Sequence, residues 1–426
     1  MNPRHVLVVG ASGFIGRRVV ACLLADGHHV TCAGRNPAAL RRRFPDCLAI
    51  PADLGGDDAA SWAPRLDGID AVVNAAGLLS GDLEGVQRRG PMALFDACAA
   101  FGVRRVVQVS ALGAGVVDTP FLHTKATADA YLLQLSREDR GRSWCVIRPS
   151  LVVGRGGAST ALFTALAAPF RPLRLGPGTW RVQPVHVAEL ARAVASLVAS
   201  PAVPEILSFV GPEPMDTDGL TSSLRTWLGL VPRHPLAIPA ALLRLGARLG
   251  EMLPGVMLTR DALRMLEAGN IADPAPVIAA LGWAPRPLAE ALAAEPACAA
   301  DLLAARMLPV RSVLLTCLAA VWVGTGVVSL LVPPTRADAL LGGLGLSGDA
   351  ALTATWTGGL LDLALGLALL SCQRRDAVLT AQLALMAAYT ALATVALPSL
   401  WLDPFGPLLK NLAVLAATLA LLAAEA

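Results

Sequence analysis

A glycine array near the start of the sequence restricts the fold more than any other feature. The stretch VLVVGASGFIGRRVV places Gly10, Gly13 and Gly16 directly after an apolar run and directly before a helical pattern. Glycines at this spacing permit a tight turn and let backbone N–H groups approach a pyrophosphate at the helix N-terminus. In this strand–turn–helix setting the array predicts a dinucleotide-binding site.

The first half of the chain alternates short β-branched runs with helical stretches. Strands are expected in HVLVVG, HHVTCAG, AVVNAAG and RRVVQVS, and helices at about 15–25 and 91–101. This alternation predicts an α/β fold, a Rossmann-type doubly wound parallel sheet. The less regular, Pro- and Gly-richer stretch that follows fits a small substrate lobe. We therefore expect a nucleotide-binding domain at 1–225, the rest of the lobe and a linker at 226–300, and a separate domain at 301–426.

The last part of the chain is too apolar for an ordinary soluble domain. The whole sequence is 55% hydrophobic and only 16% charged, and the excess lies beyond about residue 311. Four apolar segments, at about 311–332, 351–372, 376–397 and 407–424, each approach the roughly 20 residues needed to cross a bilayer. They predict a four-helix transmembrane bundle, with buried soluble helices as the alternative.

Basic residues near these segments predict the orientation. Arg306 and Arg311 precede the first segment, and Arg374 and Arg375 separate the second from the third. The 333–350 connection carries a single arginine. By the positive-inside rule, both the N-terminal domain and the C-terminus should face the cytoplasm. Because MNPRHVLVVG lacks the apolar region of a secretion signal, we expect a multi-pass protein of a bacterial-type inner (cytoplasmic) membrane.

Composition gives little support to nucleic-acid-binding or metal-binding proteins. The net charge is +3, without a basic face interleaved with aromatics, so no nucleic-acid partner is expected. The eight cysteines contain no C-x-x-C pair and no Cys/His cluster, so no metal site is expected either.

The second expected strand ends in CAGRNP, where an NAD site usually offers an acidic residue to the ribose 2′-hydroxyl. Here the position is Arg35, whose guanidinium suits a 2′-phosphate. NADP(H) is therefore favoured over NAD(H) as the cofactor.

A set of motifs in the right order resembles an atypical short-chain dehydrogenase/reductase. They are GASGFIG, PADL, VVNAAG, VRRVVQVSALGA, the lysine at 125, VIRPSLVVG and QPVHVAELA. The branch that they resemble is related to the nucleotide-binding accessory subunit of respiratory complex I, and NAD-dependent epimerase/dehydratase-like proteins share this extended pattern. The resemblance implies that Asp53 reaches the adenine, that 75–77 line the nucleotide, and that Pro149 approaches the nicotinamide end. The implied cofactor-binding residues are Gly10, Ser12, Gly13, Phe14, Ile15, Gly16, Arg35, Asn36, Asp53, Leu54, Ala75, Ala76, Gly77, Ser110, Lys125, Pro149 and Val152.

The C-terminal region resembles the DoxX-like four-helix membrane family, through TWTGGLLDLALGLALL and LDPFGPLLKN. This resemblance implies a topology more than a chemistry.

The stretch TPFLHTK decides what chemistry is expected. Catalytic members of the dehydrogenase family carry Y-x-x-x-K on a helix, where the lysine lowers the tyrosine pKa and the tyrosine passes a proton. Here Ser110 and Lys125 remain as catalytic candidates, but Phe121 occupies the tyrosine position. His123 and Tyr131 lie about 200° and 240° round the helix from the lysine, so neither shares its face.

Three readings remain open from the sequence. The first is a membrane-anchored NADP(H)-binding reductase, redox-linked to a lipophilic or quinone-like substrate. The second is a non-catalytic nucleotide-binding scaffold or redox sensor with membrane protein partners. The third is an extended-type epimerase, which also normally needs the missing tyrosine.

Two further patterns predict contacts with or within the bilayer. Asp362 and Lys410 lie inside apolar segments, and their opposite charges predict a pair, with a snorkelling lysine as the equal alternative. The glycines 358 and 359 should allow close helix approach. The helix expected at 240–253 places leucines at 242, 245, 249 and 253 on one face. This face packs on its own domain or, as the alternative, lies on the membrane surface.

Overall fold

The computed structural model describes residues 3–252, 258–371, 374–404 and 406–425. The chain divides into two compact units: Met1–Leu249 with Met257–Ala305, and Gly250–Val256 with Arg306–Ala426. The finer boundaries expected at residues 225 and 300 stay predictions.

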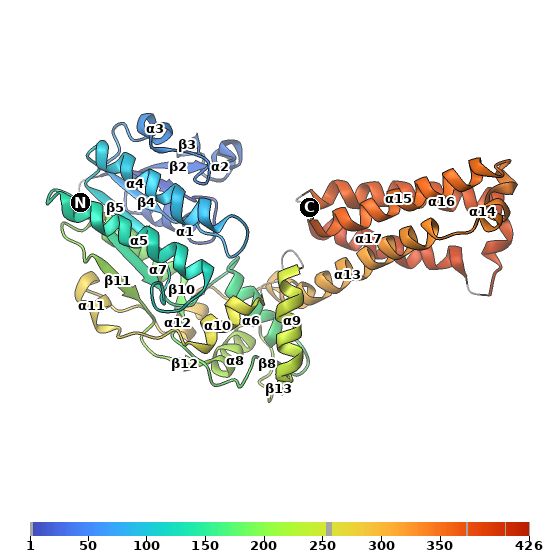
Figure 1. The fold of residues 1–426 in the computed structure, drawn as a ribbon. Helices are drawn as coiled ribbons and strands as arrows, with labels where there is room; N and C mark the ends of the chain where they lie inside the picture. The colour runs from blue at the N-terminus through green and yellow to red at the C-terminus, as the bar shows by residue number, and fades with distance from the viewer. Residues whose placement is uncertain (1–2, 253–257, 372–373, 405, 426) are drawn as a thin grey trace. The chain divides into compact units, whose positions relative to one another are not determined.

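A seven-stranded sheet forms the centre of the first unit (Figure 1). Its order is β3-β2-β1-β4-β5-β6-β11, and every pairing is parallel. The predicted doubly wound sheet is therefore confirmed, and the strand order reverses between β1 and β4. The strands are β1 (His5–Val9), β2 (His29–Gly34), β3 (Leu48–Pro51), β4 (Ala71–Asn74), β5 (Arg105–Val109), β6 (Cys145–Pro149) and β11 (Ile206–Phe209).

Helices cover both faces of this sheet because successive strand residues point to opposite sides. In β1, Val6 and Val8 join one core with α1 (Gly16–Ala25), α7 (Val187–Ala199) and α11 (Ala275–Leu281). Leu7 and Val9 join the opposite core with α4 (Gly90–Ala100) and α5 (Pro120–Glu138). The remaining helices of this part are α2 (Pro37–Arg43), α3 (Ala59–Trp62), η1 (Ala63–Arg65) and η2 (Gly85–Arg89).

A smaller lobe follows β6 and has its own apolar core, which includes Phe163, Leu220 and Leu263. Within the described residues, three two-stranded sheets and five helices build this lobe, and its role toward a substrate stays a prediction. The sheets are β7 (Val152–Val153) with β10 (Val185–His186), β8 (Leu173–Arg174) with β13 (Leu236–Ala237), and β9 (Arg181–Val182) with β12 (Met215–Asp216). The helices are α6 (Ala158–Ala167), α8 (Thr217–Trp227), α9 (Ala240–Met252), α10 (Arg260–Glu267) and α12 (Leu288–Ala293).

Helix α9 does not pack by the leucine face that the sequence singled out. Leu243 and Ala247 are buried against the lobe, whereas Leu242 and Leu245 are exposed. Leu253 lies outside the described residues. The helix therefore packs on its own domain, as expected, but through Leu243 and Ala247 rather than through Leu242 and Leu245. The side chain of Leu249 is also outside the description.

Four long apolar helices dominate the second unit, and each is long and apolar enough to cross a membrane. They are α13 (Ala299–Leu330), α15 (Asp349–Ser371), α16 (Arg375–Ala396) and α17 (Pro407–Glu425). Shorter elements connect them: α14 (Pro334–Leu341), η3 (Gly342–Leu344) and η4 (Pro398–Trp401). Because many of their leucines and valines remain exposed on the bundle surface, this unit suits a lipid environment, as expected.

The helices approach closely at glycines, as predicted. A Cβ built on Gly359 would lie 2.9 Å from the carbonyl oxygen of Gly326, and one on Gly358 would lie 3.1 Å from Tyr389 Oη. Larger residues would force the helices apart at these points.

The predicted pair between Asp362 and Lys410 is not formed. Asp362 is buried and accepts a hydrogen bond from Tyr389 Oη at 3.1 Å, whereas Lys410 is exposed. Tyr389 also lies 3.3 Å from the Gly358 carbonyl oxygen. A phenol that can donate to a buried carboxylate offsets part of its desolvation cost, which is what the lysine was expected to do.

Candidate nucleotide site

The glycine turn lies where the strand order reverses, at the carboxyl ends of β1 and β4. Gly10 follows β1 with φ +79°, and a Cβ there would lie 2.8 Å from the backbone nitrogen of Ala76. Ala76 follows β4, so the two strand ends come together. In open α/β sheets ligands bind at such a crevice, outside the carboxyl ends of the strands.

The third glycine of the array is packed most tightly. A Cβ on Gly16 would lie 2.1 Å from the carbonyl oxygen of Gly10, while one on Gly13 would meet the same atom at 3.2 Å. Gly16 is the first residue of α1. Because the three glycines carry no side chains, the backbone N–H groups of the turn and the N-terminus of α1 are accessible to an anion. These observations fit a bound pyrophosphate.

The remaining residues of the turn have different surroundings. Ser12 is exposed, Ile15 is the residue before α1, and the Phe14 ring lies against Gly157 of the lobe. Arg17 stacks over Phe14 at 5.9 Å from the ring centroid. The turn is therefore supported from the lobe side as well as from the sheet.

The residues expected at the adenosine end follow β2 and β3. Arg35 is exposed directly after β2, and Asn36 accepts a hydrogen bond from Ala39 N as the N-cap of α2. Asp53 is exposed, but Leu54 is buried in the sheet core. Leu54 is therefore placed to support this edge of the site through packing.

The turn after β4 is held by an amide pair that sequence reasoning missed. Asn74 Oδ1 accepts from Ala76 N at 3.2 Å, and Asn74 Nδ2 donates to Gln108 Oε1 at 2.8 Å. Both side chains are fully buried. The sequence did offer a signal for this pair, since both residues are polar and lie near the ends of neighbouring strands, β4 and β5. The carboxyl ends of parallel strands meet at one edge of the sheet, so such side chains can contact each other there. Gly77 follows and is exposed.

Lys125 reaches this edge from α5. Its ammonium donates to the carbonyl oxygens of Ala76, at 3.1 Å, and Val109, at 3.0 Å. An ammonium has three donors, and within the described residues these two bonds leave one for a ligand. A Cβ on Gly77 would lie 3.4 Å from Nζ. Burial lowers the pKa of Lys125 to about 8, against the opposing effect of Asp129.

The hydroxyl of Ser110 is engaged by a buried carboxylate. Ser110 Oγ donates to Asp129 Oδ2 at 2.7 Å, and Arg148 Nε donates to the same oxygen at 3.0 Å. Burial raises the pKa of Asp129, although Ser110 and Arg148 oppose this. Asp129 was not among the predicted residues. Its position four residues after Lys125, on the same helical face, was the signal.

The tyrosine position gives the site no hydroxyl. Phe121 lies in the first turn of α5, and His123 is exposed. Tyr131 donates to Asp96, and this carboxylate raises the pKa of Tyr131 to about 12. Tyr131 is therefore committed to Asp96, in keeping with the interpretation that it does not replace the missing tyrosine.

The expected nicotinamide end consists of the segment after β6. Pro149 is buried at the end of β6, and Val152 is half-buried in β7. Val152 also packs against the core that contains Ala11. Both predicted residues therefore lie at the same sheet edge as the glycine turn.

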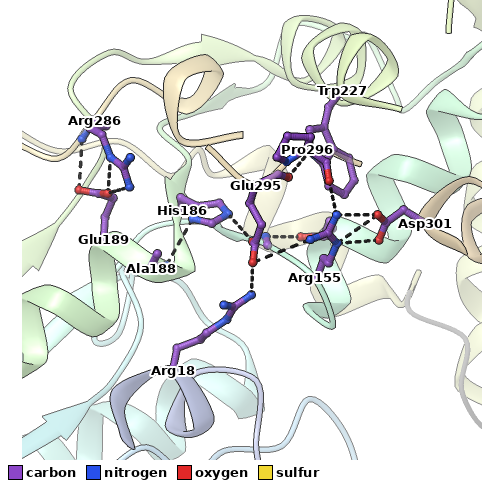
Figure 2. Close-up of polar contacts among 12 residues, drawn as sticks. Arg18, Arg155, His186, Ala188, Glu189, Trp227, Arg286, Glu295, Pro296 and Asp301 are labelled. Carbon is purple, nitrogen blue, oxygen red and sulfur yellow. Dashed lines mark hydrogen bonds and ion pairs between the residues drawn. The ribbon is translucent and has the colours of Figure 1, made fainter. Parts of the chain in front are cut away.

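A second polar cluster joins α1 to the start of α13 (Figure 2). Glu295 forms ion pairs with Arg18 and, at 3.9 Å, with Arg155, and lies 3.4 Å from His186 Nε2. Arg155 Nε donates to both carboxylate oxygens of Asp301, at 3.0 and 3.1 Å. Burial lowers the pKa of His186, with Glu295 opposing. The cluster fixes the segment that enters α13 to the helix that carries the glycine turn.

Comparisons with known proteins agree with both parts of the chain. The family described as NAD(P)H-binding matches residues 10–164, and the DoxX-like family matches residues 319–419. The chain therefore carries an NAD(P)-binding Rossmann domain and a C-terminal DoxX-like region.

Several curated relatives are named as epimerase family proteins, reductases or dehydrogenases. A chloroplastic epimerase family protein of Arabidopsis thaliana is 26% identical over 58% of this chain and 76% of its own length. A ceramide reductase of Caulobacter vibrioides is 28% identical over 51% of this chain and 66% of its own. A 3-beta-hydroxysteroid dehydrogenase of Mycolicibacterium neoaurum is 29% identical over 36% of this chain and 48% of its own.

Solved structures share the fold of the first unit. The UDP-glucose 4-epimerase of Thermotoga maritima has a TM-score of 0.52 and 19% identity, covering 71% of this chain and 98% of that chain. The enzyme of Thermus thermophilus, solved with NAD, has a TM-score of 0.50 and 20% identity, covering 68% and 96%. At this identity the likeness concerns the fold.

Proposed function

We propose that this protein is a membrane-anchored NAD(P)H-dependent oxidoreductase that acts on a lipophilic or quinone-like substrate and prefers NADP(H). The observation that carries the proposal is Lys125, a buried ammonium beside the glycine turn, in a chain that also holds four apolar helices. Two relatives support a lipophilic substrate, because one is named as a ceramide reductase and the other as a hydroxysteroid dehydrogenase, and ceramides and steroids are both lipids.

Different residues of this chain would bind different parts of the cofactor. The glycine turn would hold the pyrophosphate, Lys125 a ribose hydroxyl, and Asp53 the adenine. Arg35, exposed after β2, would pair with a 2′-phosphate through a charge-assisted bond. When bound, the nicotinamide supplies or accepts hydride.

Proton supply cannot follow the usual tyrosine route, because Phe121 has no acidic proton. Lys125, with a pKa lowered by burial to about 8, is a better acid at neutral pH than an exposed lysine. Quinone reduction can also draw its protons from water. Hydride transfer without a tyrosine is therefore chemically consistent with this site.

A second candidate function is nucleotide binding without turnover, as a sensor or scaffold with membrane protein partners. Two observations favour it: Phe121 at the tyrosine position, and the Ser110 hydroxyl already bonded to Asp129. Binding requires the glycine turn and Lys125, but not a proton donor.

One experiment separates the two functions. Full-length protein in detergent is titrated with NADPH and NADH, and cofactor oxidation is followed with and without a short-chain quinone or a long-chain keto-lipid. Arg35→Ala should weaken NADPH binding but not NADH binding, whereas Arg41→Ala, a neighbouring exposed arginine, serves as the matched control.

Turnover that requires the lipophilic acceptor supports the reductase. Tight NADPH binding without turnover, unchanged in Phe121→Tyr, rejects the reductase and supports the sensor. Equal NADPH affinity in wild type and Arg35→Ala would reject the NADP(H) preference.

We also propose that both the first unit and the C-terminus face the cytoplasm of a bacterial-type inner membrane. The proposal depends on the arginines that flank the apolar helices. A reporter fused after residue 426 that is active only in the periplasm would contradict it.

A further inference from the structure

An exposed apolar patch lies on the lobe. We define the apolar patch by five residues, Phe170, Val231, Leu236, Leu242 and Leu245, whose exposed fractions are 75%, 70%, 49%, 58% and 51%. Side chains of this size that gather at a surface mark an interaction site more often than isolated exposed residues do.

Buried polar contacts hold the parts of the patch together. Arg225, only 4% exposed, donates to the carbonyl oxygens of Phe170, at 3.2 Å, and Val231, at 2.7 Å. Leu236 N donates to Pro172 O at 2.7 Å. One guanidinium and one strand pairing therefore fix two loops side by side.

Helix α9 adds the remaining residues of the patch. It begins three residues after β13 and packs on the lobe through Leu243 and Ala247. Because Leu242 and Leu245 lie away from that buried face, the helix turns a second apolar row outward. A helix that is buried on one face and exposes apolar side chains on another has a surface suited to a second binding partner.

Exposed arginines come from the same segments as the patch residues. Arg171, Arg233, Arg244 and Arg248 are all exposed. The Arg233 guanidinium lies 3.9 Å from the ring centroid of Phe170. Apolar side chains together with basic ones match the anionic headgroups and acyl boundary of a bilayer.

The segment that carries Phe170 packs against the first turns of α13, which still belong to the first unit. Ala168, two residues before Phe170, packs with Leu228 and with Ala305 of α13. Ala305 precedes Arg311 by six helical residues, about 9 Å at the rise of an α-helix. The chain therefore tethers the lobe covalently, through α13, to the apolar helices.

We propose that the apolar patch docks on the surface of an anionic bilayer, with its leucines and Phe170 in the interface and its arginines on lipid phosphates. Docking would hold the lobe against the bilayer, where a lipophilic molecule can pass from the acyl region toward the nucleotide site. This inference does not depend on whether the nucleotide is turned over.

Hydrogen exchange of the full-length protein in nanodiscs tests the proposal. Neutral phosphatidylcholine discs are compared with discs that contain phosphatidylglycerol, and peptides covering 168–173 and 229–248 are followed. We expect slower exchange in the anionic discs, reversed by high salt in the wild type, since salt screens the arginines.

Variants make the test specific. Each arginine near an anionic surface strengthens binding about fivefold, so Arg233→Gln, Arg244→Gln and Arg248→Gln together should weaken docking about a hundredfold and abolish the protection. The control, Phe101→Ser with Arg104→Gln and Arg140→Gln, changes exposed residues of the first unit outside the patch and should leave the protection intact.

Three outcomes would overturn the proposal. They are equal exchange in both kinds of disc, protection that survives in the triple variant, and protection that appears in detergent and grows with protein concentration. The last would show that a second copy of the chain covers the patch.

Discussion

Replacement of Gly16 by alanine tests whether the glycine turn is shaped by backbone contact. The added Cβ would lie 2.1 Å from the carbonyl oxygen of Gly10 and 2.8 Å from its carbon. Ordinary contact begins at 3.4 Å, so the turn would have to open by about 1.3 Å (3.4 minus 2.1). Both atoms belong to the backbone, so no side-chain rotation relieves the clash.

The expected cost follows from this geometry. Overpacking of a close-packed site costs about 1–3 kcal/mol, and a clash with backbone should reach the upper value. At about 2–4 °C per kcal/mol for a large domain, the first unit should unfold about 6–12 °C lower. NADPH affinity should fall at least about tenfold, because the displaced turn is the one that we propose holds the pyrophosphate.

Thermal unfolding and NADPH fluorescence titration of the full-length protein in nanodiscs measure both effects. Gly13→Ala is the matched control within the turn, since its Cβ meets the same oxygen at 3.2 Å and needs only a small adjustment. Gly246→Ala, with nothing within 4 Å, controls for the general effect of the substitution. Because Gly13 is itself a predicted cofactor-binding residue, it is the control for unfolding only. A Gly16→Ala protein that unfolds like Gly13→Ala and binds NADPH like Gly246→Ala would refute the reasoning.

Three further predictions concern buried charges. The pKa of Lys125 is lowered from 10.5 to about 8, so its contribution to stability is fully present above pH 10.5 and lost as pH falls through 8. As pH rises from 8 to 10.5, the free energy of unfolding of the nucleotide-free wild type should increase by about 3 kcal/mol relative to Lys125→Met. Unfolding free energies of the two proteins that change in parallel with pH would contradict this. Arg148→Met leaves Asp129, which is fully buried, without its cation, and should cost about 3–5 kcal/mol of unfolding free energy; denaturant midpoints equal to wild type would show that the carboxyl is neutral. Tyr389→Phe removes a hydrogen bond to Asp362 in the bundle and should lower the free energy of unfolding in nanodiscs by about 1–3 kcal/mol. The loss should be smaller when Asp362 is already replaced by leucine. Equal losses in both backgrounds would exclude coupling between Tyr389 and Asp362.

Local patterns predicted most of the fold of the first unit. The strand–turn–helix around Gly10 and Gly16 was predicted because apolar periodicity and glycine spacing are properties of adjacent residues. The four apolar helices were predicted for a similar reason, since span length depends on bilayer thickness. In the site, Lys125 was predicted to lie on a helix, and it reaches the carboxyl edge of the sheet from α5. Its contact with a nucleotide stays a prediction.

Partners of the polar groups were harder to predict. Opposite charges and the nearby glycines favoured a pair between Asp362 and Lys410, with a snorkelling lysine as the equal alternative. Tyr389 is the residue that donates a hydrogen bond to Asp362. A charge pattern does not show how helices are rotated about their axes, and rotation decides which side chains face each other. The same limit applied to α9, whose buried face contains Leu243 rather than the leucines of its longest row.

By itself, the sequence determined the elements, their order and the membrane-crossing segments, because these depend on hydrophobic period and length. Only the tertiary structure decided that Ser110 is bonded to Asp129, that Lys125 lies between two backbone carbonyls, and that two loops and α9 form one exposed patch. Each of these contacts joins residues from different elements, and their distances depend on how the sheet and helices pack. The nucleotide turn was therefore determined locally, whereas the chemistry around it depends on contacts that only folding brings together.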